Sequence, residues 1–168
     1  MPAVTRARTA RKTGSKTSAA RQIASFLAKY EAKIAADARA SRTKLREMLP
    51  GGTEFVYDNY NALVFGYGPT DRPSEAVLSL AIMPRWVTLC FLKGAKLRDP
   101  KKLLGGGGNI VRNIHLSSPR HLEDRDVREL IDQAIDGARP GFSGKQGRQQ
   151  TVIRSVSAKQ RPRRPSKS

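Results

Sequence analysis

Two long apolar runs separated by a proline constrain this chain more than any other feature. The first run covers residues 76–83 and the second covers residues 86–92, and both are rich in leucine and β-branched residues. The Pro84-Arg85 pair between them interrupts the pattern, as a tight turn between two strands does. We therefore predict a β-hairpin. Because both faces of each run are apolar, we expect central strands that helices cover on at least one side.

A third predicted strand covers residues 110–116 and contains an arginine among apolar residues. Side chains alternate between the faces of a strand, so Arg112 shares a face with Ile114 and Leu116. A guanidinium in such a place must be paired or reach a cavity, because a dry, unpaired charge costs on the order of several kcal/mol. Three roles for Arg112 remain open: a structural ion pair, an arginine at a sheet edge whose charge reaches solvent, or an anion-binding group in a pocket.

Helical periodicity surrounds the predicted strands. Between residues 18 and 48, and again between residues 123 and 136, apolar side chains recur at three- and four-residue spacings. The first strand or strands are expected within residues 54–67. These patterns predict an α+β fold, a two-layer sandwich in which an antiparallel β-sheet is flanked by N-terminal and C-terminal helices, with disordered basic tails.

The formal net charge of +18 is concentrated at the two ends of the chain. Residues 1–46 hold twelve basic and two acidic residues, and residues 139–168 hold nine basic residues and no acidic one. The first twenty or so residues, and those from 139 onward, are poor in large apolar groups, which leaves little to offset the entropy of ordering. We predict disordered basic tails at 1–19 and 139–168 around a domain at 20–138. The Thr151-Val152-Ile153 patch is too short to fold alone.

Basic tails attract polyanions through counterion release, which predicts non-specific binding of DNA or RNA. The alternatives are that the tails only keep the domain soluble, or that the first tail directs import into an organelle. Under the nucleic-acid hypothesis the contacts come from basic residues of both tails: Arg6, Arg8, Arg11, Lys12, Arg161, Arg163 and Arg164.

A series of short motifs lies within the predicted domain: YDNYNAL at 57–63, GYGP at 66–69, FLKGAKL at 91–97, DP at 99–100, LL at 103–104 and RNI at 112–114. In this order and spacing, over about residues 23–138, they resemble the YdhG-like domain of unknown function. The resemblance implies an α+β sandwich similar in outline to frataxin and the YjbR-type proteins, with a helix break near Tyr30. Some members are described as frataxin-like intracellular iron chaperones.

A small-ligand pocket at one end of the sheet is the first candidate site. Polar groups beside an aromatic wall are typical of small-molecule sites, although ordinary packing and turn chemistry explain the same residue types. The hypothesis makes the protein a non-enzymatic small-ligand-binding or chaperone-like module. The candidate residues are Tyr57, Asp58, Tyr60, Asn61, Trp86, Lys93, Lys96 and Arg112.

The last predicted helix offers a second candidate, a weak metal site. Glu129, Asp132 and Asp136 lie on a side of this helix that can form an acidic ridge, and carboxylate oxygens suit hard cations such as iron. A solvated amphipathic face is the alternative. The first helical region carries only three acidic residues, which departs from the iron-binding pattern of frataxin-like proteins.

The sequence shows no catalytic constellation. Cys90 is the single cysteine, and the two histidines, His115 and His121, have no nearby cysteine to complete a zinc site. No nucleophile elbow is present, and no apolar segment reaches transmembrane length. We expect a soluble cytoplasmic protein that needs no cofactor, unless the iron alternative holds.

Overall fold

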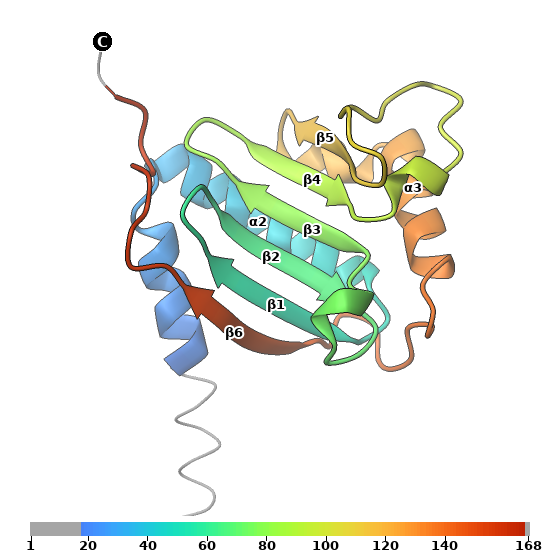
Figure 1. Ribbon diagram of the computed structural model, residues 1–168, viewed down its shortest axis with the longest axis horizontal. Coiled ribbons are helices and arrows are strands. Elements are labelled where there is room, and N and C mark those ends of the chain that lie inside the picture. The colour runs from blue at the N-terminus through green and yellow to red at the C-terminus, as the bar shows by residue number, and fades with distance from the viewer. Residues whose placement is uncertain (1–17, 167–168) are drawn as a thin grey trace, which may run out of the picture.

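Three helices lie on one face of a six-stranded sheet in the computed structural model, which describes residues 18–166 (Figure 1). The first helix spans residues 18–27, α2 spans Ala32–Met48, and α3 spans Arg125–Asp136. The predicted break falls at Tyr30, whose buried hydroxyl donates to the carbonyl of Ile82 at 2.8 Å and accepts from the N–H of Leu63 at 3.1 Å. Among these described residues, no helix is both long and apolar enough to cross a membrane.

The strands of the sheet are ordered β5-β4-β3-β2-β1-β6. Neighbouring strands are antiparallel except for β6, which is parallel to β1. The predicted hairpin is β3–β4, closed by a 2.9 Å hydrogen bond from the N–H of Met83 to the carbonyl of Trp86. The α+β class is therefore confirmed. The strand bounds are β1 Thr53–Asp58, β2 Leu63–Gly68, β3 Leu78–Ile82, β4 Val87–Phe91, β5 Arg112–Leu116 and β6 Gln150–Val156.

The core lies between α2, α3 and one face of the sheet. A row of directly paired residues crosses five strands on this face, and each of them is buried: Val56, Phe65, Leu80, Leu89 and Ile114. Ala38 of α2 is completely buried, and its small side chain permits close packing of this helix. Removal of this apolar surface from water is the main term that stabilises the layers.

A buried ionic cluster fastens α2 and β6 to β1. The completely buried carboxylate of Glu54 accepts two hydrogen bonds from Arg42, at 2.8 and 2.7 Å, and one from Arg46. The hydroxyls of Tyr67 and Thr151 also donate to it, at 2.8 and 2.9 Å. Burial alone raises the pKa of Glu54, but the hydrogen bonds and charges of the two arginines outweigh burial, so this pKa is lowered.

The segment after residue 138 corrects the prediction that 139–168 is a disordered tail. Residues 150–156 form β6, which extends the sheet along the free edge of β1, and Ile153 packs against the core. The backbone of β1 provides hydrogen-bond partners for the backbone of β6, so the apolar patch at residues 151–153 does not have to fold alone. Arg163 is only 4% exposed because it pairs with buried Asp58. Of the tail predicted at residues 1–19, residues 18 and 19 already belong to the first helix, and residues 1–17 lie outside the described residues.

Candidate ligand-binding site

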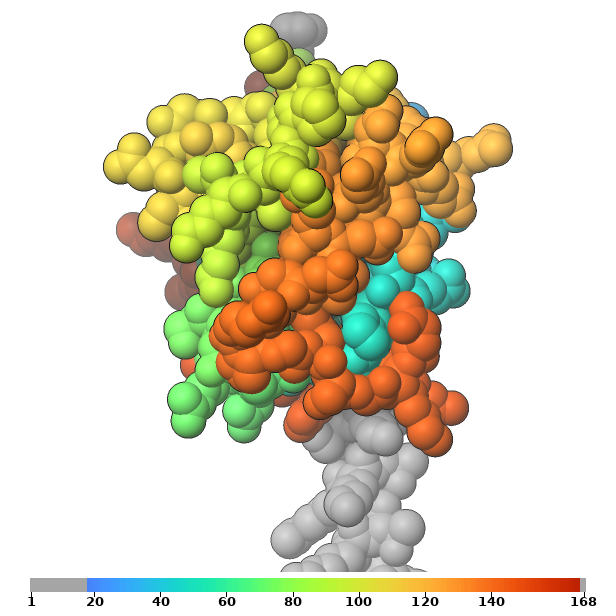
Figure 2. Space-filling model, turned by 90° about the vertical axis from the view of Figure 1, so that its right-hand side faces the viewer, coloured from blue at the N-terminus to red at the C-terminus, as the bar shows by residue number. Residues whose placement is uncertain are grey.

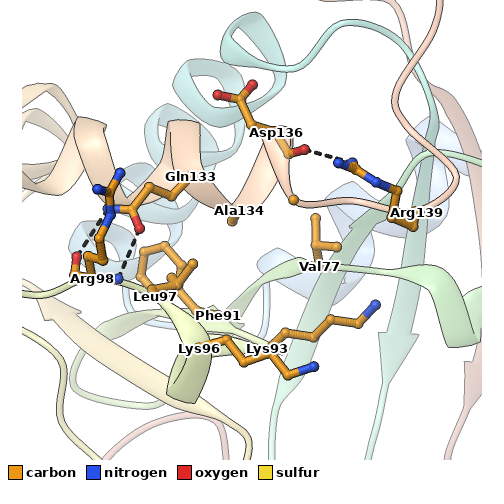
Figure 3. Close-up of a pocket in the computed structure, with 11 residues that line it drawn as sticks. Val77, Phe91, Lys93, Lys96, Leu97, Arg98, Gln133, Ala134, Asp136 and Arg139 are labelled. Atoms are coloured by element: carbon orange, nitrogen blue, oxygen red, sulfur yellow. Dashed lines mark hydrogen bonds between the residues drawn. The ribbon is translucent and has the colours of Figure 1, made fainter.

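A pocket of about 570 Å³ opens between the end of α3 and the segment that follows β4. Figure 2 shows this side of the molecule, where side chains of the two segments meet, and Figure 3 shows the lining residues. Apolar groups of Val77, Phe91, Leu97 and Ala134 line it. Small-molecule sites usually have volumes of roughly 300–1,000 Å³ and mostly apolar walls, so both properties suit a small organic ligand.

The walls of the pocket are fixed by hydrogen bonds between distant segments. The side chain of Gln133 on α3 accepts from the N–H of Arg98 at 2.9 Å and donates to the carbonyl of Arg98 at 3.0 Å (Figure 3). At the end of α3, the guanidinium of Arg139 donates to the carbonyls of Asp136 and Ala138, at 2.8 and 2.6 Å. The two Gln133 bonds join α3 to the segment after β4, and the Arg139 bonds fix the chain at the end of α3, so both walls of the pocket are held in place.

A glycine shapes the turn beneath the pocket. The 3₁₀ turn at Gly94–Lys96 lies against the start of β5. A Cβ atom at Gly94 would come within 2.6 Å of the Cβ of Arg112, a distance that no side chain tolerates. Only glycine therefore lets this turn pack on β5 and direct Lys96 to the pocket.

The charges around the pocket are predominantly positive. Lys93, Lys96, Arg98 and Arg139 line it, together with a single carboxylate, Asp136. Figure 3 shows both lysines on the side opposite α3, whereas the carboxylate of Asp136 points away from the pocket. Neither lysine forms an ion pair with any residue in the range 18–166. Two ammonium groups therefore remain available to an anion.

Of the eight predicted pocket residues, only Lys93 and Lys96 line this pocket. The strand register explains why. Asp58, Leu63, Ile82 and Val87 are paired in sequence at one end of the sheet, whereas Phe91 and Arg112 are paired at the other end. This register corrects the predicted single pocket, since it places Tyr57, Asp58, Tyr60, Asn61 and Trp86 at the opposite end of the sheet from Lys93, Lys96 and Arg112.

Asp58 has a structural role. Its buried carboxylate accepts a hydrogen bond from Lys29 at 2.8 Å and one from Arg163 at 2.9 Å. Burial alone raises the pKa of Asp58, but the hydrogen bonds from its cationic partners outweigh burial and lower this pKa. Asp58 therefore holds the C-terminal segment and the first helical region on the sheet, and it does not face a pocket.

The other predicted residues at this end of the sheet remain accessible. Tyr57 is half-buried on the face away from the helices, and Asn61 is exposed in the β1–β2 turn. Tyr60 is 50% exposed and Trp86 is 41% exposed. The indole of Trp86 stacks on the ring of His115, with 5.1 Å between centroids and 18° between planes.

Arg112 lies on the edge strand β5 with its guanidinium at the surface, which fits the snorkelling arginine left open by the sequence and neither of the other two roles. Among residues 18–166 it has no ion-pair partner, and it does not line the pocket. Its guanidinium instead donates to the carbonyls of Gly108 and Val111. Arg112 thus folds the glycine-rich segment back on β5 and solvates its own charge with backbone dipoles.

Sequence reasoning missed the pocket roles of Arg98, Gln133 and Arg139. Arg139 lies just beyond the predicted domain boundary, so it was assigned to a tail. Gln133 is a polar residue directly beside Ala134 on the buried side of α3. A glutamine at such a position is a signal of a polar contact with a facing segment, but it does not identify that segment.

The predicted metal group is not formed. Glu129, Asp132 and Asp136 are all exposed on α3, and Asp132 pairs with Arg128 at 3.4 Å. In the part of the chain that the structure describes, no three His, Cys, Asp or Glu residues are placed to hold a metal ion together. The solvated amphipathic face, the alternative left open by the sequence, describes these three residues.

The predicted nucleic-acid residues divide into three groups. Arg6, Arg8, Arg11 and Lys12 lie outside the described residues. Arg163 is buried against Asp58, which corrects its assignment to a free tail. Arg161 and Arg164 are exposed: the first lies over the ring of Tyr60, and the second donates to the carbonyl of Lys29 at 3.2 Å.

Comparisons of the chain with protein-family models, curated proteins and solved structures found no match. The resemblance to the YdhG-like domain therefore stays a prediction, and the functional argument depends on the geometry of the pocket.

Proposed function

We propose that this YdhG-like protein is a small-ligand-binding module whose pocket takes an organic anion with an apolar body. The observation that supports this proposal most directly is the position of two unpaired ammonium groups, on Lys93 and Lys96, beside an apolar pocket. A carboxylate, sulfonate or phosphate pairs with these lysines, while an aromatic or aliphatic body covers the partly exposed side chain of Leu97 and the apolar wall beside it.

The two parts of the pocket favour such a ligand for different reasons. Burial of apolar surface contributes about 25 cal/mol for each Å², so the body of the ligand supplies most of the affinity. The ammonium groups are exposed to solvent, where a single ion pair contributes up to about 1 kcal/mol. The charges therefore select an anion over a neutral molecule of the same shape, and this selectivity weakens with salt.

A pair of matched dyes tests the proposal. 1-Anilinonaphthalene-8-sulfonate carries an apolar body and one anionic group, and N-phenyl-1-naphthylamine has the same body without the charge. Fluorescence titration of the full chain should show tighter binding of the sulfonate. The double variant Lys93→Ala with Lys96→Ala should reduce the affinity for the sulfonate several-fold and leave the affinity for the neutral dye nearly unchanged.

The matched control removes two other exposed charges, with Arg120→Ala and Lys145→Ala. Both residues lie outside the pocket and take part in no ion pair within residues 18–166. The control should bind the sulfonate as the unchanged protein does. Equal losses of affinity in both double variants would mean that net charge causes the binding, and equal affinity for the two dyes would mean that the dyes bind to apolar surface without selecting an anion. Either result would contradict the proposal.

A further inference from the structure

Two turns at the end of the sheet opposite the pocket each present an accessible aromatic residue. Leu63 of β2 pairs with Ile82 of β3, so the β1–β2 turn and the β3–β4 turn lie side by side at this end (Figure 1). Tyr60 lies in the first turn and Trp86 in the second, and they are 50% and 41% exposed. Neither ring belongs to the buried core.

The C-terminal segment adds cations to the same end of the sheet. The N–H of Arg161 donates to the carbonyl of Tyr60 at 2.8 Å, and the guanidinium of Arg161 lies over the Tyr60 ring, 5.7 Å from its centroid. The backbone bond thus fixes a cation beside an aromatic surface. Arg85, Lys159 and Arg164 are also exposed here.

Acidic residues are sparse in the two turns and in the C-terminal segment packed on them. Within residues 58–61, 83–86 and 157–166, which form the two turns and the segment packed on them, the only acidic residue is Asp58. Its carboxylate is buried between Lys29 and Arg163. The surface therefore combines positive potential with two aromatic platforms, and we define it by Tyr60, Arg85, Trp86, Lys159 and Arg161.

We propose that this surface binds single-stranded nucleic acid. Unpaired bases stack on aromatic rings and on guanidinium planes, and the phosphates between them are attracted to neighbouring cations. The two turns are separated by two strand spacings, roughly 10 Å, so one extended single strand can place nearby bases on both rings. A duplex keeps its bases stacked and paired, so it cannot use either ring.

The sequence pattern alone does not favour stacking, because no aromatic residue lies among the basic residues of 1–19 or 145–168. The fold supplies the missing rings from the two turns, about 100 and 75 residues away in sequence. Because β6 and Asp58 hold the C-terminal segment in place, its cations are presented at fixed positions and not on a mobile tail.

Trp86 is the only tryptophan in the chain, and its fluorescence therefore reports this surface alone. The full chain is titrated with a 15-nucleotide oligothymidylate at low and moderate salt. Stacking of a base on the indole should quench its emission, and the affinity should fall steeply as salt rises. The same titration with a 15-base-pair duplex should give little quenching.

Two variants and one control complete the test, with a 5′-labelled oligothymidylate followed by fluorescence anisotropy. Tyr60→Ala and Arg161→Ala should each weaken binding, Tyr60→Ala by about fivefold or more, the lower end of the effect of removing a stacking ring. The Lys145→Ala, Arg148→Ala double variant removes more charge than Arg161→Ala but lies at the other end of the sheet, beside the bridge between Pro50 and Gln146, and it should weaken binding less.

Three results would overturn the proposal. Quenching by the duplex at least as strong as by the single strand would exclude base stacking. An equal or greater loss in the Lys145→Ala, Arg148→Ala control would assign the binding to net charge. Binding to anionic phosphatidylserine vesicles as tight as to the oligonucleotide, with the same quenching, would identify a lipid surface as the partner.

Discussion

Substitution of Arg163 by alanine should destabilise the whole fold, although the sequence places this residue in a predicted tail. In the structure its guanidinium donates to the carboxylate of buried Asp58 and to the carbonyls of Asn59 and Tyr60. Removal of the guanidinium leaves Asp58 with Lys29 as its remaining cationic partner, and it releases the C-terminal segment from the β1–β2 turn.

The expected cost is about 2–3 kcal/mol. Breaking a buried ion pair costs about 3–5 kcal/mol, and a hydrogen bond to a charged group contributes about 1.5–3 kcal/mol. Two features of the structure place the cost of Arg163→Ala toward the lower end of these ranges. Lys29 still compensates the charge of Asp58, and the Nε of Arg163 has no hydrogen-bond partner among the described residues. For a domain of this size, the loss corresponds to a Tm lower by about 4–12 °C.

Urea denaturation followed by far-ultraviolet circular dichroism measures this cost, and Arg164→Ala is the matched control. Arg164 is the next residue, is exposed, and makes one hydrogen bond, to the carbonyl of Lys29. Its loss should cost less than about 0.5 kcal/mol. If Arg163→Ala is as mild as Arg164→Ala, the C-terminal segment is not fastened to the domain and the reasoning fails.

Three further predictions concern acid stability, the thiol and a glycine. The pKa values of Glu54 and Asp58 are lowered in the folded protein, so these carboxylates stabilise it above their unfolded pKa of about 4, and the stabilisation disappears as the pH falls through the lower folded values. The urea concentration at the midpoint of unfolding should therefore decrease when the pH is below 4, and it should decrease less in Glu54→Gln. Burial raises the pKa of the Cys90 thiol, so its reaction with Ellman's reagent at pH 8 should be slow in the folded protein and fast in urea; equal rates would contradict this expectation. Gly52→Ala should cost at least about 1–3 kcal/mol in urea denaturation, since Gly52 has a φ of +87° and its Cβ would lie 2.2 Å from a carbonyl oxygen, whereas Gly107→Ala, in open space, should be nearly neutral; similar costs at the two sites would refute the steric argument.

The sheet and its helices could be predicted because their signals are local. The apolar runs at 76–83 and 86–92 and the helical periodicity of 123–136 depend on side chains that repeat within one element. Each such element needs only a generic apolar surface to cover it. The central hairpin β3–β4 and α3 therefore appear in the structure close to where the sequence places them.

The sixth strand could not be predicted because its stability comes from a distant partner. Residues 150–156 hold three neighbouring β-favouring residues in a segment that is otherwise polar and basic. The free edge of β1 and the buried carboxylates of Glu54 and Asp58 make this segment ordered. Composition describes the segment itself, and it does not reveal the groups elsewhere in the chain that need it.

The candidate site could be predicted only in part, because most of its residues are brought together by contacts between distant segments. Lys93 and Lys96 lie in one short motif, and both line the pocket. The assignment of the Tyr57–Asn61 segment to the same pocket fails because it requires the strand register, which decides the end of the sheet at which each turn lies. The opposite wall, from Gln133 to Arg139, requires the packing of α3 against the segment after β4.

The most direct test of the pocket is a titration of the ¹⁵N-labelled full chain with 1-anilinonaphthalene-8-sulfonate, followed by amide chemical shifts. If an organic anion binds as proposed, the signals of residues 93–98 and 133–139 should shift together and saturate with one dissociation constant, while those of residues 59–61, 85 and 86 remain in place. Shifts that scatter over the surface, or that concentrate at the two turns, would contradict the assignment of the pocket as the ligand site.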